Sequence, residues 1–593
     1  MPFDNICLAA AVKDCQTLIG AKLTKIYQPD KYTVLLRLYG EGKQHRLLLC
    51  ANPQDGRLQT TQFNAENPAK PPLFCMVLRK HLENARLLKL QQTPGERIVR
   101  LDFAAHDEIG TPTARTLVLE IMGKHSNLLL LDTPSGQIID AARRYSHNVS
   151  RHREVLPGVT YLAPPASERP DWQRLEPEKL AELLLNGNLS LPPARLLQST
   201  MAGLSSQLAA EICYRAGLQE LNNCEQLGEY EINRLDQQLQ KMRQILAEER
   251  FQPVLLRQTN SRPVAYLGFY PLPLLAVESN IEQQEFADFS SALDCFYQSR
   301  LLQQSFNAEQ HQLAKLLNKE EQRLHKKIKL QTADLQAAGN AEQYKNAGEL
   351  LTAYLHLVQP GQKQVELPSF YDPEQLMRIK LRPELSAAEN AKRYFHRYNK
   401  AKNAEKQITR QLELNRAEYD YVQSLQAALA EAEDLTDLQA VSQEMQTAGY
   451  QKLHPTNQKQ NKLNAGSLPP RRYQTSDGFT LLLGRNNRQN DRLTTKMAAP
   501  DDIWLHTQKI PGSHVILKQD AGRDFTETAL REAAALAAYH SQARQADKVP
   551  VDYTEVHNVK KPNGARPGMV IYFEQQTLYV QPRELTPCED TED

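Results

Sequence analysis

The sequence lacks paired cysteines and an excess of charge of one sign. Its eight cysteines lie far apart, and no two of them form a Cys-x-x-Cys pair, which argues against both a zinc site and a disulfide framework. Lys and Arg number 71 and Asp and Glu 70, so only local clustering of charge can indicate a nucleic-acid partner. We expect reduced, mostly buried thiols, no bound metal and no cofactor.

Long apolar runs are also missing. No stretch approaches the roughly 20 residues that cross a bilayer, and Asp4 stands where a secretory signal carries positive charge. These features predict a cytoplasmic protein without a membrane partner. The 593 residues, 41% hydrophobic and 24% charged, are globular in composition and too many for one hydrophobic core. We therefore expect several domains.

The first half of the chain mixes strand and helix patterns. Residues 1–170 predict an α+β domain, with strand-like alternation at 33–38 and 115–121 and a helical run at 72–87 that starts at Pro72. Residues 171–300 follow a proline-rich segment; we expect helices from about 173 to 250, then short strand-like pieces and a helix at 253–298. Within them, 203–218 resembles a helix-hairpin-helix unit.

The second half is dominated by two helical runs rich in Gln, Lys, Glu and Leu. They lie at 301–337 and 389–434 within residues 301–450, and they predict a long antiparallel coiled coil with an insertion between its arms. At 1.5 Å per residue such arms reach roughly 55 to 70 Å. A polar linker is predicted at 451–470, an α/β domain at 471–580 with a helix at 527–545, and an acidic tail at 581–593.

Two N-terminal stretches carry residue types suited to phosphate. In MGKHSN, the charge of Lys124 and the short polar groups of Ser126 and Asn127 stand beside His125. The basic segment 143–153, which begins with Arg143 and Arg144, suits an RNA backbone. A plain polar turn and a solvated basic loop remain open as alternatives.

Glu96 and Arg97 follow a Pro-Gly turn, just before a predicted strand. At such a position Arg97 could contact a phosphate or a base edge while Glu96 orients it. Considered alone, the pair is more simply interpreted as a surface ion pair.

The second long helical run begins with basic residues interleaved with aromatic ones. Arg393, Arg397 and Lys400 stand beside Tyr394 and Tyr398. Such spacing suits an RNA surface, because cations meet phosphates while rings stack on bases. A solvated helix face is an equally good interpretation.

The C-terminal region contains GRNNRQND at 484–491 and DIWLHTQKIPGSHVILK at 502–518, which predict a hairpin-like unit. The spacing of its two histidines is not an established metal-ligand pattern, so stacking and hydrogen bonding to RNA are favoured over a metal site. The candidate RNA-binding residues here are Arg485, Asn486, Asn487, Trp504, His506, His514, Lys560 and Lys561.

Taken together, these strings resemble the NFACT family. The resemblance is carried by FDNICLAAAV at 3–12, KIYQPDK at 25–31, NPAKPPLFCMVLRKHLENARL at 67–87, EIMGKHSNLLLLD at 120–132, LAAEICYRAGL at 208–218, ENAKRYFHRYNKAK at 389–402, the two C-terminal strings above, and VDYTEVHNVKKPNGARPG at 551–568.

The resemblance implies an architecture and a function. The fold would comprise an N-terminal domain of the formamidopyrimidine-glycosylase type, a helix-hairpin-helix domain, a long coiled coil reaching the ribosomal stalk base, and a C-terminal RNA-binding domain. The protein would bind a large ribosomal subunit that holds a peptidyl-tRNA. It would recruit alanyl-tRNA, so that the stalled chain gains a C-terminal alanine tail and is degraded.

The resemblance also implies roles for residues. Peptide-bond formation would belong to the ribosome, so the chain itself would not be an enzyme. The family's N-terminal Asp-Arg pair, needed for tRNA recruitment, corresponds here to Glu96-Arg97. The glutamate keeps the carboxylate but lengthens the side chain by one methylene, which puts tailing in more doubt than ribosome binding.

Two other functions compete with RNA binding. A DNA glycosylase or lyase could use Pro2 as an amine nucleophile, but Phe3 stands where those enzymes carry Glu, and the chain has no zinc-finger cysteines. A surface fibronectin-binding adhesin would need an export route, and the sequence shows no signal peptide. Both are disfavoured against RNA binding.

Overall fold

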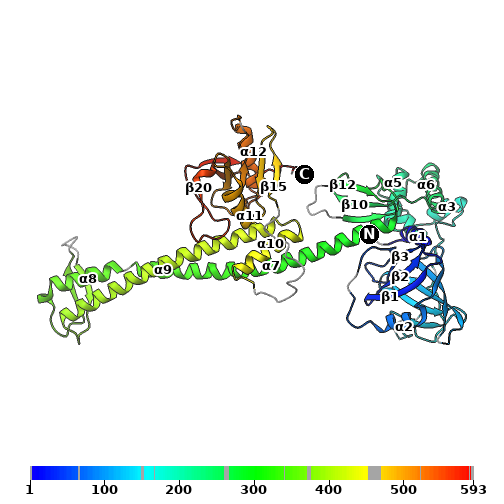
Figure 1. The fold of residues 1–593 in the computed structure, drawn as a ribbon, viewed down its shortest axis with the longest axis horizontal. Coiled ribbons are helices and arrows are strands. Elements are labelled where there is room, and N and C mark those ends of the chain that lie inside the picture. Colours follow the sequence, from blue (N-terminus) through cyan, green and yellow to red (C-terminus); the bar gives the residue numbers. More distant parts are fainter. Residues whose placement is uncertain are drawn as a thin grey trace. The chain divides into compact units, whose positions relative to one another are not determined.

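The computed structural model describes residues 3–64, 67–107, 109–148, 152–165, 167–259, 266–339, 341–369, 376–451, 469–520, 522–586 and 588. The chain divides into two units, residues 1–303 and 304–593, which are taken in turn (Figure 1). Pro2, most of the predicted linker and much of the acidic tail lie outside the described residues. The predicted boundaries of the smaller domains stay predictions.

A nine-stranded antiparallel sheet dominates the first part of unit one, in the order β4-β3-β2-β1-β5-β6-β7-β8-β9. Apolar side chains of this sheet and of helix α1 (Asn5–Cys15) share one core. The strands are β1 (Lys22–Asp30), β2 (Thr33–Gly40), β3 (Lys43–Cys50), β4 (Arg57–Thr60), β5 (Arg86–Gln92), β6 (Ile98–His106), β7 (Pro112–Glu120), β8 (Asn127–Asp132) and β9 (Ile138–Ala141).

Helix α2 (Leu73–Leu82) is shorter than the helix predicted at 72–87. Pro72 stands at its N-cap, as expected. The helix ends because Glu83 takes an extended backbone with ψ of 132°, and Asn84 then adopts a left-handed backbone with φ of 70°. Leu87 pairs with Phe103 inside the sheet, so the apolar residues that suggested a longer helix belong to a strand.

The rest of unit one shares the same core. As predicted, its described residues form helices up to Ala247 and then short strands, which pair in a three-stranded sheet in the order β11-β10-β12. The elements are α3 (Pro177–Leu185), α4 (Pro193–Thr200), α5 (Ser206–Arg215), α6 (Glu229–Ala247), β10 (Val254–Gln258), β11 (Tyr266–Tyr270) and β12 (Ile281–Glu285).

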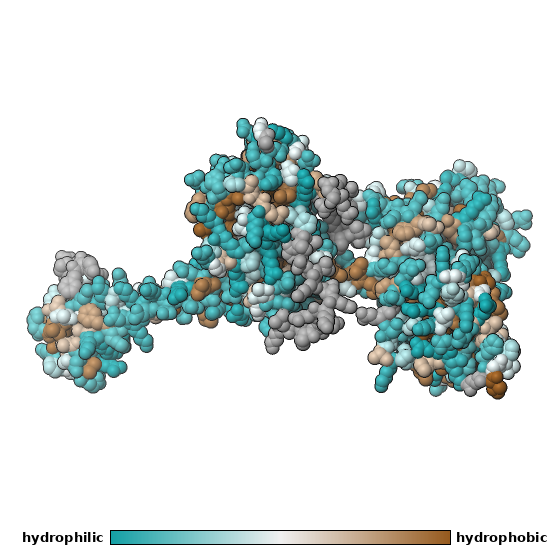
Figure 2. Space-filling view, viewed as in Figure 1, coloured by the Kyte–Doolittle hydropathy of each residue, from teal (hydrophilic) through white to brown (hydrophobic). Residues whose placement is uncertain are grey.

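Two long helices, α7 (Phe289–Ala338) and α9 (Ala387–Ala430), confirm the predicted pair of helical runs. In unit two they pack antiparallel, since Gln331, Glu321 and Gln310 of α7 bond to Asn415, Tyr419 and Leu429 of α9. Apolar side chains from both helices form their seam. The outer surface of the pair is largely hydrophilic (Figure 2).

The segment between these helices has a core of its own. It contains α8 (Ala341–Ala353), β13 (Gln364–Pro368) and β14 (Leu376–Lys380), of which the two strands pair antiparallel. Helix α10 (Leu435–Thr447) follows α9 and joins the apolar seam of the helix pair.

The C-terminal part is a six-stranded antiparallel sheet in the order β15-β16-β18-β17-β19-β22, covered by α12 (Glu527–Tyr539). The predicted hairpin is confirmed by the pairing of Trp504 with Ile516. Helix α12 ends at Tyr539 rather than at 545, because His540 leaves the helical region. The other elements are β15 (Arg471–Gln474), β16 (Thr480–Leu483), α11 (Asn487–Arg492), β17 (Ile503–Thr507), β18 (Val515–Leu517), β19 (Val549–Glu555), β20 (Val559–Lys560), β21 (Ile571–Tyr572) and β22 (Gln576–Val580).

No helix within the described part of the chain has both the length and the apolar character needed to cross a bilayer.

Candidate nucleic-acid interface

The N-terminal candidates meet at one end of the nine-stranded sheet. The first residue of β6 pairs with the last residue of β7, Glu120, which in turn pairs with the first residue of β8, Asn127. The carbonyl of Arg97 accepts a hydrogen bond from the Ile121 amide at 2.9 Å. Strand β9 ends beside the start of β8. We call the group gathered here the sheet-end site: Glu96, Arg97, Lys124, His125, Arg143 and Arg144.

The turn before β8 contains both buried and exposed candidate residues. Ser126 is buried, and its hydroxyl accepts a hydrogen bond from the Met122 amide at 2.8 Å. Asn127 is also buried; its amide accepts from the backbone N–H of Leu128 and of Arg143 and donates to the Arg143 carbonyl, each at 2.9 Å. Lys124 and His125 are exposed. Ser126 and Asn127 therefore position the turn, and Lys124 and His125 face solvent.

Arg143 links the turn to a tyrosine. Its guanidinium donates to the Lys124 carbonyl and lies 4.3 Å from the centre of the Tyr32 ring. A hydrogen bond from Arg143 and its positive charge lower the pKa of Tyr32. Arg144, by contrast, donates to both carboxylate oxygens of Asp140, at 2.7 and 2.9 Å. The charge of Arg144 is thus partly neutralised.

Glu96 sits in a half-buried turn. Gln92 donates to the Glu96 carbonyl at 2.9 Å, and Asn5 donates to the Gly95 carbonyl at 2.8 Å. Burial raises the pKa of the Glu96 carboxyl; Arg97 opposes this rise, and Asp171 adds to it. Among the described residues, no ion pair of 4.0 Å or less joins Glu96 to Arg97. The Glu96 carboxyl and the Arg97 guanidinium are therefore not paired with each other.

A second positive region lies at the start of α9, which we call the basic helix end: Arg382, Arg393, Arg397 and Lys400. The guanidinium of Arg397 lies 5.9 Å from the ring centres of both Tyr344 and Tyr394. Burial, then repulsion by Arg397 and Arg382, lowers the pKa of Arg393. Within the described residues, Arg393, Arg397 and Lys400 form no ion pair, so their charge is available to an external anion.

The GRNNRQND segment is committed to internal contacts. The Asn486 side chain caps α11 by accepting from the Gln489 amide at 2.9 Å, and Asn487 donates to the Ser424 hydroxyl of α9 at 2.9 Å. Each of the two asparagines is 4% exposed. Arg485 lies 3.7 Å from Asp437. These residues hold the C-terminal sheet on the helix pair rather than presenting a free polar surface.

The two lysines of the basic turn differ in their surroundings. Lys561 forms an ion pair with Asp491 at 2.8 Å, whereas Lys560 is exposed at the end of β20. Lys560 is therefore the freer of the two cations.

The hairpin histidines and tryptophan line a cavity of about 460 Å³, which we call the aromatic pocket. Trp504 is 1% exposed and His514 3% exposed, so the indole is a wall of this pocket rather than an open platform. Burial lowers the pKa of His506 and, more strongly, that of His514. Across the residues that the structure describes, no group of three or more His, Cys, Asp or Glu is arranged to hold a metal ion.

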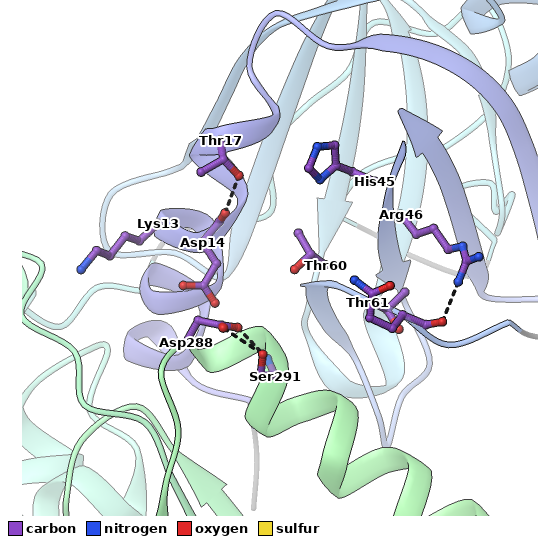
Figure 3. Close-up of a pocket in the computed structure, with 10 residues that line it drawn as sticks. Lys13, Asp14, Thr17, His45, Arg46, Thr60, Thr61, Asp288 and Ser291 are labelled. Carbon is purple, nitrogen blue, oxygen red and sulfur yellow. Dashed lines mark hydrogen bonds between the residues drawn. The ribbon is translucent and has the colours of Figure 1, made fainter. Parts of the chain in front are cut away.

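A separate polar pocket of about 460 Å³ lies in unit one between α1, β3, β4 and the start of α7 (Figure 3). Its acidic residues are already engaged there. Asp14 accepts from the Ser290 amide at 2.8 Å, and Asp288 accepts from the amide and hydroxyl of Ser291 at 2.7 and 2.8 Å. These carboxylates cap the first turn of α7, which is a structural role.

Known protein families match most of the chain. Residues 4–464 match the model of the NFACT N-terminal and middle domains, and residues 470–572 match that of the NFACT protein RNA binding domain. The chain is 36% identical to the Rqc2 homolog RqcH of Bacillus subtilis over 572 residues, covering 96% of this chain and 95% of that protein. It is 35% identical to the Rqc2 homolog RqcH of Streptococcus pneumoniae serotype 2 over 587 residues, or 98% of each.

Two solved structures are also similar. The N-terminal part of the fibronectin/fibrinogen-binding protein from Streptococcus suis is 31% identical, covers 50% of this chain and 99% of its own, and has a TM-score of 0.41. The C-terminal part of that protein is 31% identical, covers 47% of this chain and 96% of its own, and has a TM-score of 0.38. With both family models matched over 4–464 and 470–572, the chain belongs to the NFACT family.

Proposed function

We propose that this protein is a ribosome quality control factor that binds large ribosomal subunits obstructed by peptidyl-tRNA. There it recruits alanyl-tRNA for template-free alanine tailing of the stalled chain. Similarity to the RqcH proteins over nearly the full length supports the general assignment. The proposal goes beyond this similarity in two respects: it names alanyl-tRNA as the recruited tRNA, and it names the residues that contact RNA.

The observation that carries the tRNA role is the sheet-end site. Arg97, Lys124, His125 and Arg143 come from three connections of one sheet and meet at its end. Buried Asn127 fixes two of these connections to each other. Lysine and arginine cations held on a rigid sheet suit the phosphates of a folded RNA, because phosphate contacts set register and orientation.

We assign ribosome binding to other surfaces of the protein. Within the described residues, Arg393, Arg397 and Lys400 of the basic helix end form no ion pair, and their positive charge suits ribosomal RNA near the stalk base. The Tyr394 ring is buried in the core of the segment between the two long helices, so the base stacking that the sequence suggested for it is not part of the proposal. In the C-terminal domain, Lys560 and the aromatic pocket complete the proposed RNA contacts. Peptide-bond formation is left to the ribosome, so the protein acts by selecting and placing tRNA in the cytoplasm. A glycosylase-type fold for the N-terminal domain and a helix-hairpin-helix at 203–218 remain predictions.

The proposal is tested by recovering the tagged full-length protein from cells and sequencing the bound RNA. We expect enrichment of large-subunit RNA together with tRNA, with alanine tRNA foremost. A Glu96→Ala, Arg97→Ala double variant should still recover large-subunit RNA yet lose tRNA. Absence of both RNA classes from the wild-type sample would refute the function, and unchanged tRNA in the variant would remove this pair from the site.

A further inference from the structure

The aromatic pocket lies between two parts of unit two. Asp420, Tyr421, Gln423 and Ser424 of α9 line one side, and residues of the C-terminal domain line the other. Its volume of about 460 Å³ falls within the roughly 300–1,000 Å³ of sites that enclose a small molecule. Both sides are held together next to the cavity, since Asn487 donates to Ser424.

The wall on the C-terminal side is a cluster of rings. His506 stacks on Trp504 with centroids 5.7 Å apart and planes 16° apart. Tyr572 lies 4.8 Å from Trp504, and His514 meets the indole edge-on at 5.2 Å. Because burial lowers the pKa of both histidines, the cluster is uncharged at neutral pH. Flat, neutral walls of this kind favour a flat aromatic ligand.

The polar lining excludes an anion and suits a base edge. Three of its lining residues, Gln423, Asn487 and Asn490, have amide side chains, each with two N–H donors and an oxygen acceptor. Gln423 donates to Tyr419, Asn487 donates to Ser424, and the Asn490 oxygen accepts from the His514 amide, so a base edge would be met by the groups that these bonds do not use. The charged lining residues, Lys509 and Asp420, are both exposed. A phosphate that moved from water into the cavity would lose its hydration. No buried cation among the described lining residues would compensate for that desolvation cost. A neutral heterocycle inside, with its phosphate near Lys509, avoids that cost.

We propose that the aromatic pocket holds one unpaired nucleobase of a bound RNA. The proposal rests on the RNA-binding function above, and it adds α9 to the RNA contacts of a domain whose matched residues are 470–572. Since the base would touch both sides of the cavity, RNA binding would also strengthen docking of the C-terminal sheet on α9. This coupling is expected because a ligand that binds only the docked arrangement stabilises that arrangement.

The test uses full-length protein and a short single-stranded oligoribonucleotide with one 2-aminopurine, compared with 2-aminopurine riboside monophosphate. Stacking in the pocket should quench the 2-aminopurine fluorescence. Gln423→Trp fills the cavity from α9 and should weaken oligonucleotide binding about 5- to 140-fold, the range expected when one stacked base is lost. The matched control, Glu413→Trp, adds the same ring at an exposed position of α9 and should bind as the wild type does.

The outcomes separate this proposal from the general function. Absence of quenching in the wild type, or equal affinity of the Gln423→Trp and Glu413→Trp variants, would overturn the pocket even if ribosomal RNA and tRNA are still recovered from cells. Monophosphate that binds as tightly as the oligonucleotide would overturn RNA as the source of the base. Circular dichroism of both variants checks that α9 keeps its helical content.

Discussion

Replacing Asn127 by alanine should loosen the sheet-end site without unfolding the sheet. The buried amide makes three hydrogen bonds, two with the backbone of Arg143 and one with that of Leu128. Each bond is worth about 0.5–1.5 kcal/mol net, and a buried group left without a partner costs about 1–3 kcal/mol. We therefore expect a local destabilisation of about 2–4 kcal/mol, which raises the open population about 30- to 700-fold.

Hydrogen exchange of the full-length protein, read by mass spectrometry, measures this directly. Amides of residues 122–145 should exchange faster in the variant, because their protection follows the local opening free energy. The control is Asn188→Ala, whose exposed side chain accepts a hydrogen bond from the Ser190 amide at 3.1 Å. Recovery of tRNA should fall in Asn127→Ala alone. Equal exchange at 122–145 in both variants would refute the positioning role of Asn127.

Burial holds the pKa of His514 well below 6.5, so the unfolded chain binds more protons and the C-terminal domain loses about 1.4 kcal/mol per pH unit below about pH 6.5. Hydrogen exchange at pH 5.5 and 7.5, corrected for intrinsic rates, should show this loss. A His514→Gln variant should lose less stability, because only His506, whose pKa burial also lowers, still contributes. Gly484→Ala should destabilise the same domain by about 1–3 kcal/mol, because the new methyl would meet the Asn490 amide oxygen at 2.1 Å; unaltered thermal unfolding would contradict this clash. Arg397→Ala should reduce the salt slope of large-subunit binding by about 1, and an unchanged slope would exclude a phosphate contact there.

Periodicity predicted much of the fold because it reports burial. The two long helical runs correspond to α7 and α9, and the strand-like stretches at 33–38 and 115–121 fall in β2 and β7. In these strands residues 33–36 and 116–120 are buried in unbroken runs rather than alternately, because both faces of the sheet are covered there. Helix ends were less predictable, since they depend on tertiary pairing. Leu87 looked helical in sequence but belongs to β5, opposite Phe103. Composition gave no sign of the pairing of β13 with β14.

The candidate site was predictable in residue type but not in exposure. Lys124 and Arg397 are exposed, as an RNA surface requires. Asn486 and Asn487 looked equally suited to phosphate, yet they cap a helix and bond to Ser424. Trp504 proved to be a buried wall, because its strand lies inside the sheet between β18 and β19. One sequence does not reveal which polar side chains already have partners.

Residue-resolved crosslinking of the protein to RNA in cells tests the central claim most directly. The proposal predicts tRNA crosslinks within residues 93–127 or at Arg143 and Arg144, and ribosomal RNA crosslinks within residues 382–400. Crosslinks to tRNA that avoid both 93–127 and 143–144, while other parts of the chain react, would contradict the assignment of tRNA to the sheet-end site.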